Sequence, residues 1–258
     1  MIVTTSGRPN EKQDQYAIQI ADVLGATYQK RNKRSVADIQ KRAMDHVIVV
    51  GKNRVELHFL NGESPLFFHP NSAMFRIKRL MKGEEDPFCD ACDLRQGDKI
   101  LDCTLGLASD SIVGSYVVGT DGLIIGVEGS RFLSYLVHKG LNQWETGLPA
   151  IDEAMRRIVV HNIDHFSYLK SCDDDSFDVV YFDPMFEESI DGSVGIEPLK
   201  KLANYSPLHA ETIEEAKRVA KKRVVLKDHY KSSRFKQFQF EVNVRKSAKF
   251  HYGVIEIS

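Results

Sequence analysis

The stretch from Lys99 to Asp110, KILDCTLGLASD, constrains the fold of this chain more than any other segment. Its apolar residues Ile100 and Leu101 end at an acid, Asp102, and a turn of small residues follows. The amphipathic run that continues to Val118 predicts a helix. Strand, tight loop and helix in this order open nucleotide-binding α/β sheets. In such sheets small residues let a ligand approach the backbone, and the helix N-terminus attracts anionic groups.

The acid Asp102 indicates which ligand the loop accepts. Its carboxylate stands where a dinucleotide would place its pyrophosphate, so it would repel that ligand and favour a cationic one. S-adenosylmethionine carries an ammonium, a sulfonium and a carboxylate suited to the loop N–H groups. A second predicted strand ends in Glu128, where an acid accepts hydrogen bonds from ribose hydroxyls. We therefore predict S-adenosylmethionine as the cofactor; the alternative is a structural strand–turn–helix with two incidental acids.

Composition and charge restrict the class of protein. The 258 residues are 42% hydrophobic and 28% charged, as in a globular protein with a sizeable core. Because the sequence shows neither a signal-peptide core nor an uncharged run able to span a bilayer, we expect a cytoplasmic protein without a membrane partner. Residues 1–83 contain 14 Lys and Arg against 7 Asp and Glu. This basic third predicts a polyanionic partner such as RNA; a solvated basic surface is the alternative.

The chain divides into two predicted domains. Residues 1–83 form a small basic α+β domain that closes with a bridging helix, Asn71–Lys82. On this helix Met74, Phe75, Ile77, Leu80 and Met81 are predicted to face a core. Arg76 and Arg79 are predicted to point outward as substrate-binding residues.

Residues 84–258 alternate strands and helices, which predicts a Rossmann-like, doubly wound parallel sheet. The predicted strands are Lys99–Cys103, Leu123–Val127, Arg157–His161, Phe177–Phe182 and Arg223–Lys227. The predicted helices are Ser109–Val118, Arg131–Gln143, Ala150–Arg156 and Pro207–Ala220. The strands Phe238–Val244 and Phe250–Ile257 follow without a helix and predict a terminal antiparallel hairpin. A parallel sheet closed in this way is the outline of class I methyltransferases.

The cysteines do not indicate a metal. Cys89 and Cys92 form one C-x-x-C, which is half a zinc site, and no second pair completes it. Reduced thiols are the expectation for a cytosolic chain, so we predict no metal.

The fourth predicted strand carries the second chemical signal. It is fully apolar, hence central, and it stops at Asp183-Pro184-Met185-Phe186. This tetrad is similar to the motif of methyltransferases that modify exocyclic amines. Such an amine is a poor nucleophile, because its lone pair is delocalised into the ring. The Asp183 carboxylate and the Pro184 carbonyl can accept both amine hydrogens and point the lone pair at the methyl group, while Phe186 stacks on the base. A strand-ending turn with a core Phe is the alternative.

Other residues are predicted at the same edge of the sheet. Asn162 and Asp164 follow the third strand, where an adenine contact is expected. Lys227 and Tyr230 leave the fifth strand. Lys227 is predicted either to meet a phosphate or to pair with Asp183.

The chain resembles, over most of its length, the small-subunit ribosomal RNA guanine-N2 methyltransferase J family. The resemblance rests on D-x-T-x-G-L-x-x-D at 102–110, Y-x-D-P-M-F at 181–186 and VVLKDHY at 224–230. It implies a class I methyltransferase fold, S-adenosylmethionine as donor and a guanine amine in rRNA as acceptor. The candidate cofactor-binding residues are Asp102, Thr104, Gly106, Leu107, Asp110, Glu128, Asn162 and Asp164. The candidate catalytic residues are Asp183, Pro184 and Phe186, and the candidate substrate-binding residues are Arg76, Arg79, Lys227 and Tyr230.

Two departures from the family bear on the substrate. Ala108 replaces a glycine of the loop, and the acidic Glu187 and Glu188 follow Phe186 where the family has a proline and a basic stretch. Acids at the substrate entrance oppose RNA phosphates. The alternatives are therefore methyl transfer to an adenine amine, a protein amide or a small molecule, or a non-catalytic RNA-binding protein. Neither the target nucleotide nor the oligomeric state follows from the sequence.

Overall fold

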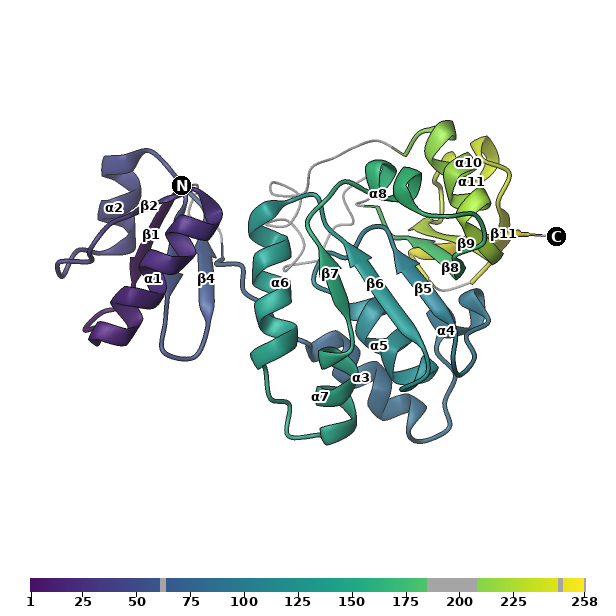
Figure 1. Cartoon of the computed structure of the whole chain (residues 1–258), viewed down its shortest axis with the longest axis horizontal. Coiled ribbons are helices and arrows are strands. Elements are labelled where there is room, and N and C mark those ends of the chain that lie inside the picture. Colours follow the sequence, from purple (N-terminus) through teal and green to yellow (C-terminus); the bar gives the residue numbers. More distant parts are fainter. Residues whose placement is uncertain (61–63, 185–207, 246–247, 258) are drawn as a thin grey trace. The chain divides into compact units, whose positions relative to one another are not determined.

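The structure, a computed structural model, describes residues 1–60, 64–184, 208–245 and 248–257. It separates a first compact unit, Met1–Phe68, from a second that begins at His69 (Figure 1). The sequence analysis placed this boundary after Gly83 instead. The difference arises because helix α3 (Asn71–Leu80) packs on helix α5 (Ser109–Val118) of the second unit.

The first unit is built on a four-stranded sheet with the strand order β2-β1-β3-β4. Its elements are β1 (Ile2–Thr5), α1 (Glu11–Leu24), β2 (Thr27–Tyr28), α2 (Val36–Ala43), β3 (Val47–Val50) and β4 (Val55–His58). β1 pairs in parallel with β2 and β3, and β4 returns antiparallel to β3. Asn10 and Ser35 form capping boxes that start α1 and α2. The carboxyl ends of three parallel strands therefore lie at one edge of this sheet.

The second unit contains a seven-stranded sheet with the order β10-β11-β9-β8-β5-β6-β7 (Figure 1). The strands are β5 (Lys99–Asp102), β6 (Leu123–Val127), β7 (Val159–His161), β8 (Phe177–Phe182), β9 (Ala220–His229), β10 (Glu241–Asn243) and β11 (Phe250–Glu256). Besides α3 and α5, the described helices are α4 (Pro87–Cys92), α6 (Arg131–Gln143), α7 (Pro149–Arg156), α8 (His165–Ser171), α10 (Ala210–Val219) and α11 (Arg234–Gln237).

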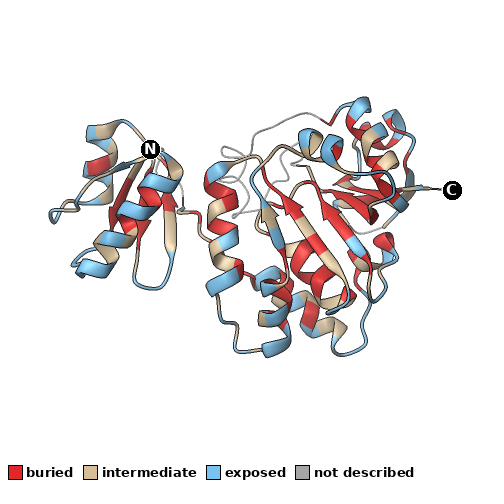
Figure 2. Cartoon of the chain, in the orientation of Figure 1, coloured by how far each residue is buried: buried red, intermediate tan, exposed pale blue. Residues whose placement is uncertain are grey.

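The pairing of these strands confirms the predicted fold class. β5 to β9 pair in parallel, whereas β11 runs antiparallel to both β9 and β10. The terminal hairpin is therefore joined to the parallel sheet through its second strand. β8 lies in the middle of the sheet, and from Val179 to Phe182 its side chains are at most 1% exposed (Figure 2). The prediction of a central buried strand before Asp183 is confirmed.

Short helices and one helix face differ from the sequence analysis. The sequence analysis did not predict α4, which forms because Asp86 caps its first turn and Pro87 follows. On α3, Phe75 is 65% exposed and Met81 47%, whereas Arg76, expected on the outer face, turns inward. The prediction for these three side chains was wrong. A helical pattern places apolar residues inside by default, but acids from other elements attract Arg76 inward.

The loop after β5 packs over the neighbouring strand at Gly126. Leu105 occupies the space above this glycine, and a Cβ there would overlap the leucine side chain. We expect Gly126→Ala to lower the free energy of unfolding by about 1–3 kcal/mol, the usual cost of overpacking. Urea unfolding monitored by circular dichroism measures this.

Gly7→Ala is the control, because a Cβ at Gly7 meets nothing within 4 Å. We expect it to change stability by no more than about 0.5 kcal/mol. Equal stability of the Gly126→Ala protein and the wild type would contradict the assigned packing.

Candidate active site

Asp102, the last residue of β5, anchors the loop that leads into α5. Its carboxylate accepts hydrogen bonds from the Thr104 N–H at 3.0 Å and the Ser111 hydroxyl at 2.6 Å. The loop reverses through Gly106 and Ala108, both with positive φ. Burial raises the pKa of Asp102 to about 7, although its hydrogen bonds oppose the shift. A cationic group placed beside it would favour the ionised form.

Glu128 joins the end of β6 to the same loop. One carboxylate oxygen accepts from the Ser130 N–H at 2.8 Å, and the other from the Gly106 N–H at 3.3 Å. Burial raises the pKa of Glu128 as well. Neither Glu128 nor Asp102 has a basic side-chain partner among the residues that the structure describes. Two buried carboxylates without cations suit a ligand that brings an ammonium and hydroxyl groups.

Asn162 and Asp164 follow β7 and make contacts within the chain. The Asn162 side chain donates to the Glu128 carbonyl at 2.8 Å. Asp164 caps α8 by accepting from the Ser167 N–H at 3.0 Å. Asn162 therefore supports the backbone that carries Glu128, and a direct contact of either side chain with a ligand stays a prediction.

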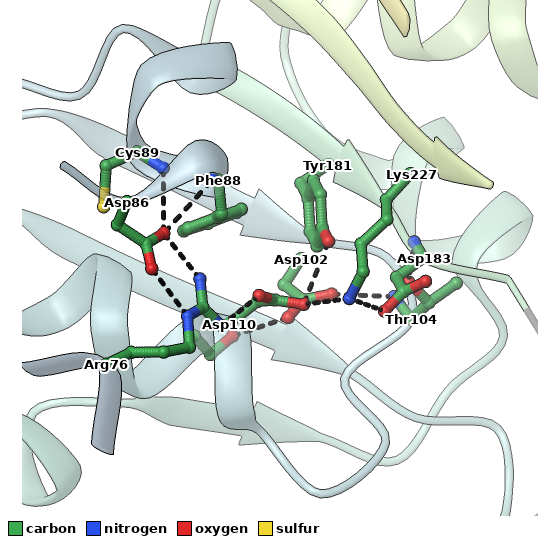
Figure 3. Close-up of polar contacts among 11 residues, drawn as sticks. Arg76, Asp86, Phe88, Cys89, Asp102, Thr104, Asp110, Tyr181, Asp183 and Lys227 are labelled. Atoms are coloured by element: carbon green, nitrogen blue, oxygen red, sulfur yellow. Dashed lines mark hydrogen bonds and ion pairs between the residues drawn. The ribbon is translucent and has the colours of Figure 1, made fainter. Parts of the chain in front are cut away.

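A chain of ion pairs runs from α3 to the end of β8 (Figure 3). Arg76 binds Asp86 with two hydrogen bonds of 2.7 Å and reaches Asp110 at 2.5 Å. Lys227 of β9 contacts Asp110 at 3.1 Å and Asp183 at 2.6 Å. Charges of opposite sign thus alternate along the whole chain of side chains.

Two further hydrogen bonds fix this chain of ion pairs to the sheet. The Tyr181 hydroxyl donates to Asp110 at 3.0 Å. The Asp183 N–H donates to the Thr104 hydroxyl at 2.6 Å, which joins the end of β8 to the loop after β5. Asp102 and Asp183 therefore lie on adjacent strand ends, as the sequence predicted.

The two carboxylates that Lys227 contacts differ in charge state. Burial would raise the pKa of Asp110, but Lys227 and Arg76 together lower it well below its usual value. Burial raises the pKa of Asp183 to about 6, with a contribution from the charge of Asp110, although Lys227 opposes the shift. Burial would lower the pKa of Lys227, yet the two acids raise it. Asp110 is thus fixed as an anion, whereas Asp183 can titrate near neutral pH.

The structure brings most predicted site residues together at the carboxyl ends of β5, β6, β8 and β9. These are Asp102, Thr104, Gly106, Asp110, Glu128, Asp183 and Lys227. Of the two roles predicted for Lys227, the structure has the pair with Asp183. Leu107 and Pro184 are half-buried beside these residues. Phe186, Glu187 and Glu188 lie outside the described residues.

The predicted substrate-binding residues have mixed outcomes. Arg76 is 17% exposed and belongs to the buried ion pairs, so its expected place on an outer basic face was wrong. Arg79 is more exposed and pairs with Glu84 at 2.7 Å. Tyr230 is 47% exposed and its ring lies 4.6 Å from that of His229, so it remains accessible to a partner.

The sequence analysis missed three partners of the site. Asp86 holds Arg76, Ser111 holds Asp102, and Tyr181 holds Asp110. An available signal for Asp86 was the Asp-Pro pair that starts a helix, and Tyr181 was part of the quoted motif. All four cysteines are free. Within the described ranges no cluster of His, Cys, Asp or Glu is arranged for a metal, and no helix is long and apolar enough to cross a membrane.

Comparisons with known proteins agree with this geometry. Residues 32–252 match the model of a family described as "Putative SAM-dependent methyltransferase". Among curated proteins, the uncharacterized protein YpiP of Bacillus subtilis is 51% identical over all of both chains. The ribosomal RNA small subunit methyltransferase J of Francisella tularensis is 29% identical over 55% of this chain and 57% of its own length.

A solved structure shares the fold. The crystal structure of a SAM-dependent methyltransferase from Neisseria gonorrhoeae matches 99% of this chain and 96% of its own, with a TM-score of 0.65 and 14% identity. This likeness agrees with the predicted fold class.

The buried ion pairs predict a large difference between two arginines of α3. Arg76→Met leaves Asp86 and Asp110 without a shared cation, so we expect unfolding free energy to fall by about 3–5 kcal/mol. Chemical denaturation at neutral pH measures this change.

Arg79→Met is the matched control on the same helix. Because the pair between Arg79 and Glu84 is solvent-exposed, we expect a change of about 0.5 kcal/mol or less. Equal effects of the two substitutions would show that the Arg76 pairs contribute no more than an exposed one.

Proposed function

The chain belongs to this family of SAM-dependent methyltransferases, and we propose that it methylates an exocyclic amine of a base in ribosomal RNA, with guanine N2 as the acceptor. The observation that carries the proposal is Asp183, a titratable carboxylate held at the end of the central strand beside the loop of Asp102. An rRNA acceptor places the reaction in the cytoplasm.

The loop after β5 and the acids beside it fit S-adenosylmethionine, which supplies a methyl group on a cationic sulfonium. In the proposal Asp102 faces the donor ammonium, because it is a buried carboxylate with only neutral hydrogen-bond donors. Glu128 accepts from the ribose hydroxyls. Thr104, Gly106 and Leu107 shape the loop. Arg76, Tyr181 and Lys227 surround Asp110, and its contact with the donor stays a prediction.

The residues after β8 are proposed to orient the acceptor. The ionised Asp183 and the Pro184 carbonyl accept the two amine hydrogens, which directs the nitrogen lone pair toward the methyl carbon. Lys227 holds the Asp183 carboxylate in place at 2.6 Å. Phe186 is proposed, from the motif alone, to stack on the base that leaves its helix or loop.

Support for an RNA acceptor comes from the relatives and from charge. The methyltransferase J of Francisella tularensis acts, by its name, on small-subunit rRNA, and it matches this chain over 144 residues. The basic first third of the chain suits a polyanion. The motif around Asp183 favours an exocyclic amine, and guanine N2 is proposed from the resemblance to the guanine-N2 methyltransferase J family.

Donor binding is expected to depend on pH through Asp102. A donor ammonium favours the ionised carboxylate, whose pKa is about 7 before binding. Affinity for S-adenosylmethionine should therefore rise about tenfold from about pH 6 to about pH 7.5 and then level off. Isothermal titration calorimetry at several pH values measures this.

Asp102→Asn should bind more weakly and lose this pH dependence, whereas the exposed Asp174→Asn should behave like the wild type. An Asp102→Asn protein that keeps the full pH dependence would assign the titration to another group.

Methyl transfer should separate from donor binding at Asp183. We expect Asp183→Ala to slow transfer about a hundredfold, on the order of 3 kcal/mol, because the amine is no longer oriented. Donor affinity should change little. The assay is single-turnover transfer to rRNA from cells that lack the gene, with nucleoside mapping to locate the methylated guanine.

Asp174→Ala removes the same charge before β8 begins and should transfer at the wild-type rate. If rRNA from the deficient cells lacks no methylated base, the rRNA acceptor is wrong. A wild-type rate for Asp183→Ala would instead refute the orienting role of this carboxylate.

A further inference from the structure

The first unit has its own loop edge at the carboxyl ends of β1, β2 and β3. Three loops meet there, at residues 6–10, 29–35 and 51–54. The Ser6 N–H donates to the Val50 carbonyl, and the Arg31 guanidinium donates to the Thr5 carbonyl at 3.1 Å. The loops are thus tied to one another. Ligands of parallel α/β sheets bind at this kind of edge.

The positive charges of the first unit are concentrated on this edge. Residues 1–68 contain ten Lys and Arg and seven Asp and Glu. Seven of the ten cations lie in the three loops, and none of the seven acids does. The loop cations are Arg8, Lys30, Arg31, Lys33, Arg34, Lys52 and Arg54. The concentration on one edge is therefore a property of the fold, because the loops are far apart in sequence.

Most of these cations are not neutralised by neighbouring acids. Asp14 accepts hydrogen bonds from Thr5 and Tyr28, and the Asp38 carboxylate accepts from the Ser35 N–H in the capping box of α2. Glu56 pairs with Arg54. In the described part of the chain no ion pair is recorded for Arg8, Lys30, Lys33, Arg34 and Lys52. All except Arg34 are exposed.

Two of the exposed cations occupy backbone conformations that favour glycine. Arg8 has φ 59 and Lys33 has φ 60. Lys33 is the third residue of a turn in which the Arg34 N–H donates to the Arg31 carbonyl at 3.0 Å. The Arg31 side chain also donates to the Arg34 carbonyl at 2.6 Å. Glycine would fit this position without strain. A strained residue that persists at a ligand edge points to a role for its side chain.

We propose that this loop edge of the first unit binds the phosphate backbone of the RNA that the second unit methylates. The identity of the polyanion as RNA rests on the proposed function, whereas the binding edge itself rests on the charges and strained turns. The three loops contain no large apolar side chain, which a membrane-binding surface would add to its cations. Several lysines and arginines around one edge suit contacts with successive phosphates.

The test uses glycine substitutions at the two strained positions, which should weaken RNA binding without destabilising the fold. Arg8→Gly/Lys33→Gly in the full chain removes two cations. It also removes backbone strain, because glycine adopts the left-handed conformation of both positions without a steric cost. We expect the thermal midpoint to stay the same or to rise. Affinity for a labelled RNA hairpin should fall at least tenfold at about 0.1 M salt, and the slope of log affinity against log salt should flatten by about 1.4–1.8 units, about 0.7–0.9 for each lost phosphate contact. Fluorescence anisotropy measures both.

The control Lys41→Ala/Arg42→Ala removes the same charge at the end of α2, which leads to the opposite edge of the sheet. It should bind RNA like the wild type. A second pair, Lys30→Ala/Lys52→Ala, should repeat the loss without touching the strained residues.

The inference is wrong if the loop pairs bind RNA as tightly as the wild type, or if the control loses as much affinity. Stronger binding to phosphatidylglycerol vesicles than to the RNA hairpin would also overturn it, in favour of a membrane surface. Because binding is measured without methyl transfer, an inactive methyltransferase would refute the proposed function and leave this test intact.

Discussion

Asp110 is the residue on which the second unit depends most, because a carboxylate that stays ionised when buried needs cations or hydrogen-bond donors around it. It lies in the first turn of α5, where the helix N-terminus also favours an anion. Arg76 comes from α3, Lys227 from β9 and the Tyr181 hydroxyl from β8. Four elements that are distant in the sequence must therefore meet at this one carboxylate.

Lys227 connects the buried Asp110 to the proposed chemistry, because it contacts both Asp110 and Asp183. Because Asp110 has two cationic neighbours, it keeps its charge at neutral pH. Burial and the negative charge of Asp110 raise the pKa of Asp183, and Lys227 opposes this shift. Lys227 holds the Asp183 carboxylate in place. In the proposal this carboxylate can still accept hydrogen bonds from an amine. The same lysine thus serves stability through Asp110 and orientation through Asp183.

The sequence predicted what short-range rules determine and missed what long-range pairing determines. The loop from Asp102 to Asp110 was predictable, because its strand, turn and helix follow each other directly. The inward turn of Arg76 was not, because Asp110 lies 34 residues away and a helical pattern carries no information about it. The exposure of Phe75 follows from the same cause. Charge counts indicated a basic first third, but only the parallel strands show which loops gather its cations.

Both units have non-glycine residues with positive φ in loops that follow their strands. Ala108 has φ 62, is fully buried and precedes α5; a glycine there would avoid a cost of about 1 kcal/mol. Its hydrogen bonds to Leu105 and from Ile112 hold it in place, so the surrounding structure outweighs the strain. In the first unit Arg8 and Lys33 bear the same strain with charged side chains. At Ala108 the conformation positions the backbone of the loop proposed to bind the donor, whereas at Arg8 and Lys33 it presents a cation on the edge proposed to bind RNA.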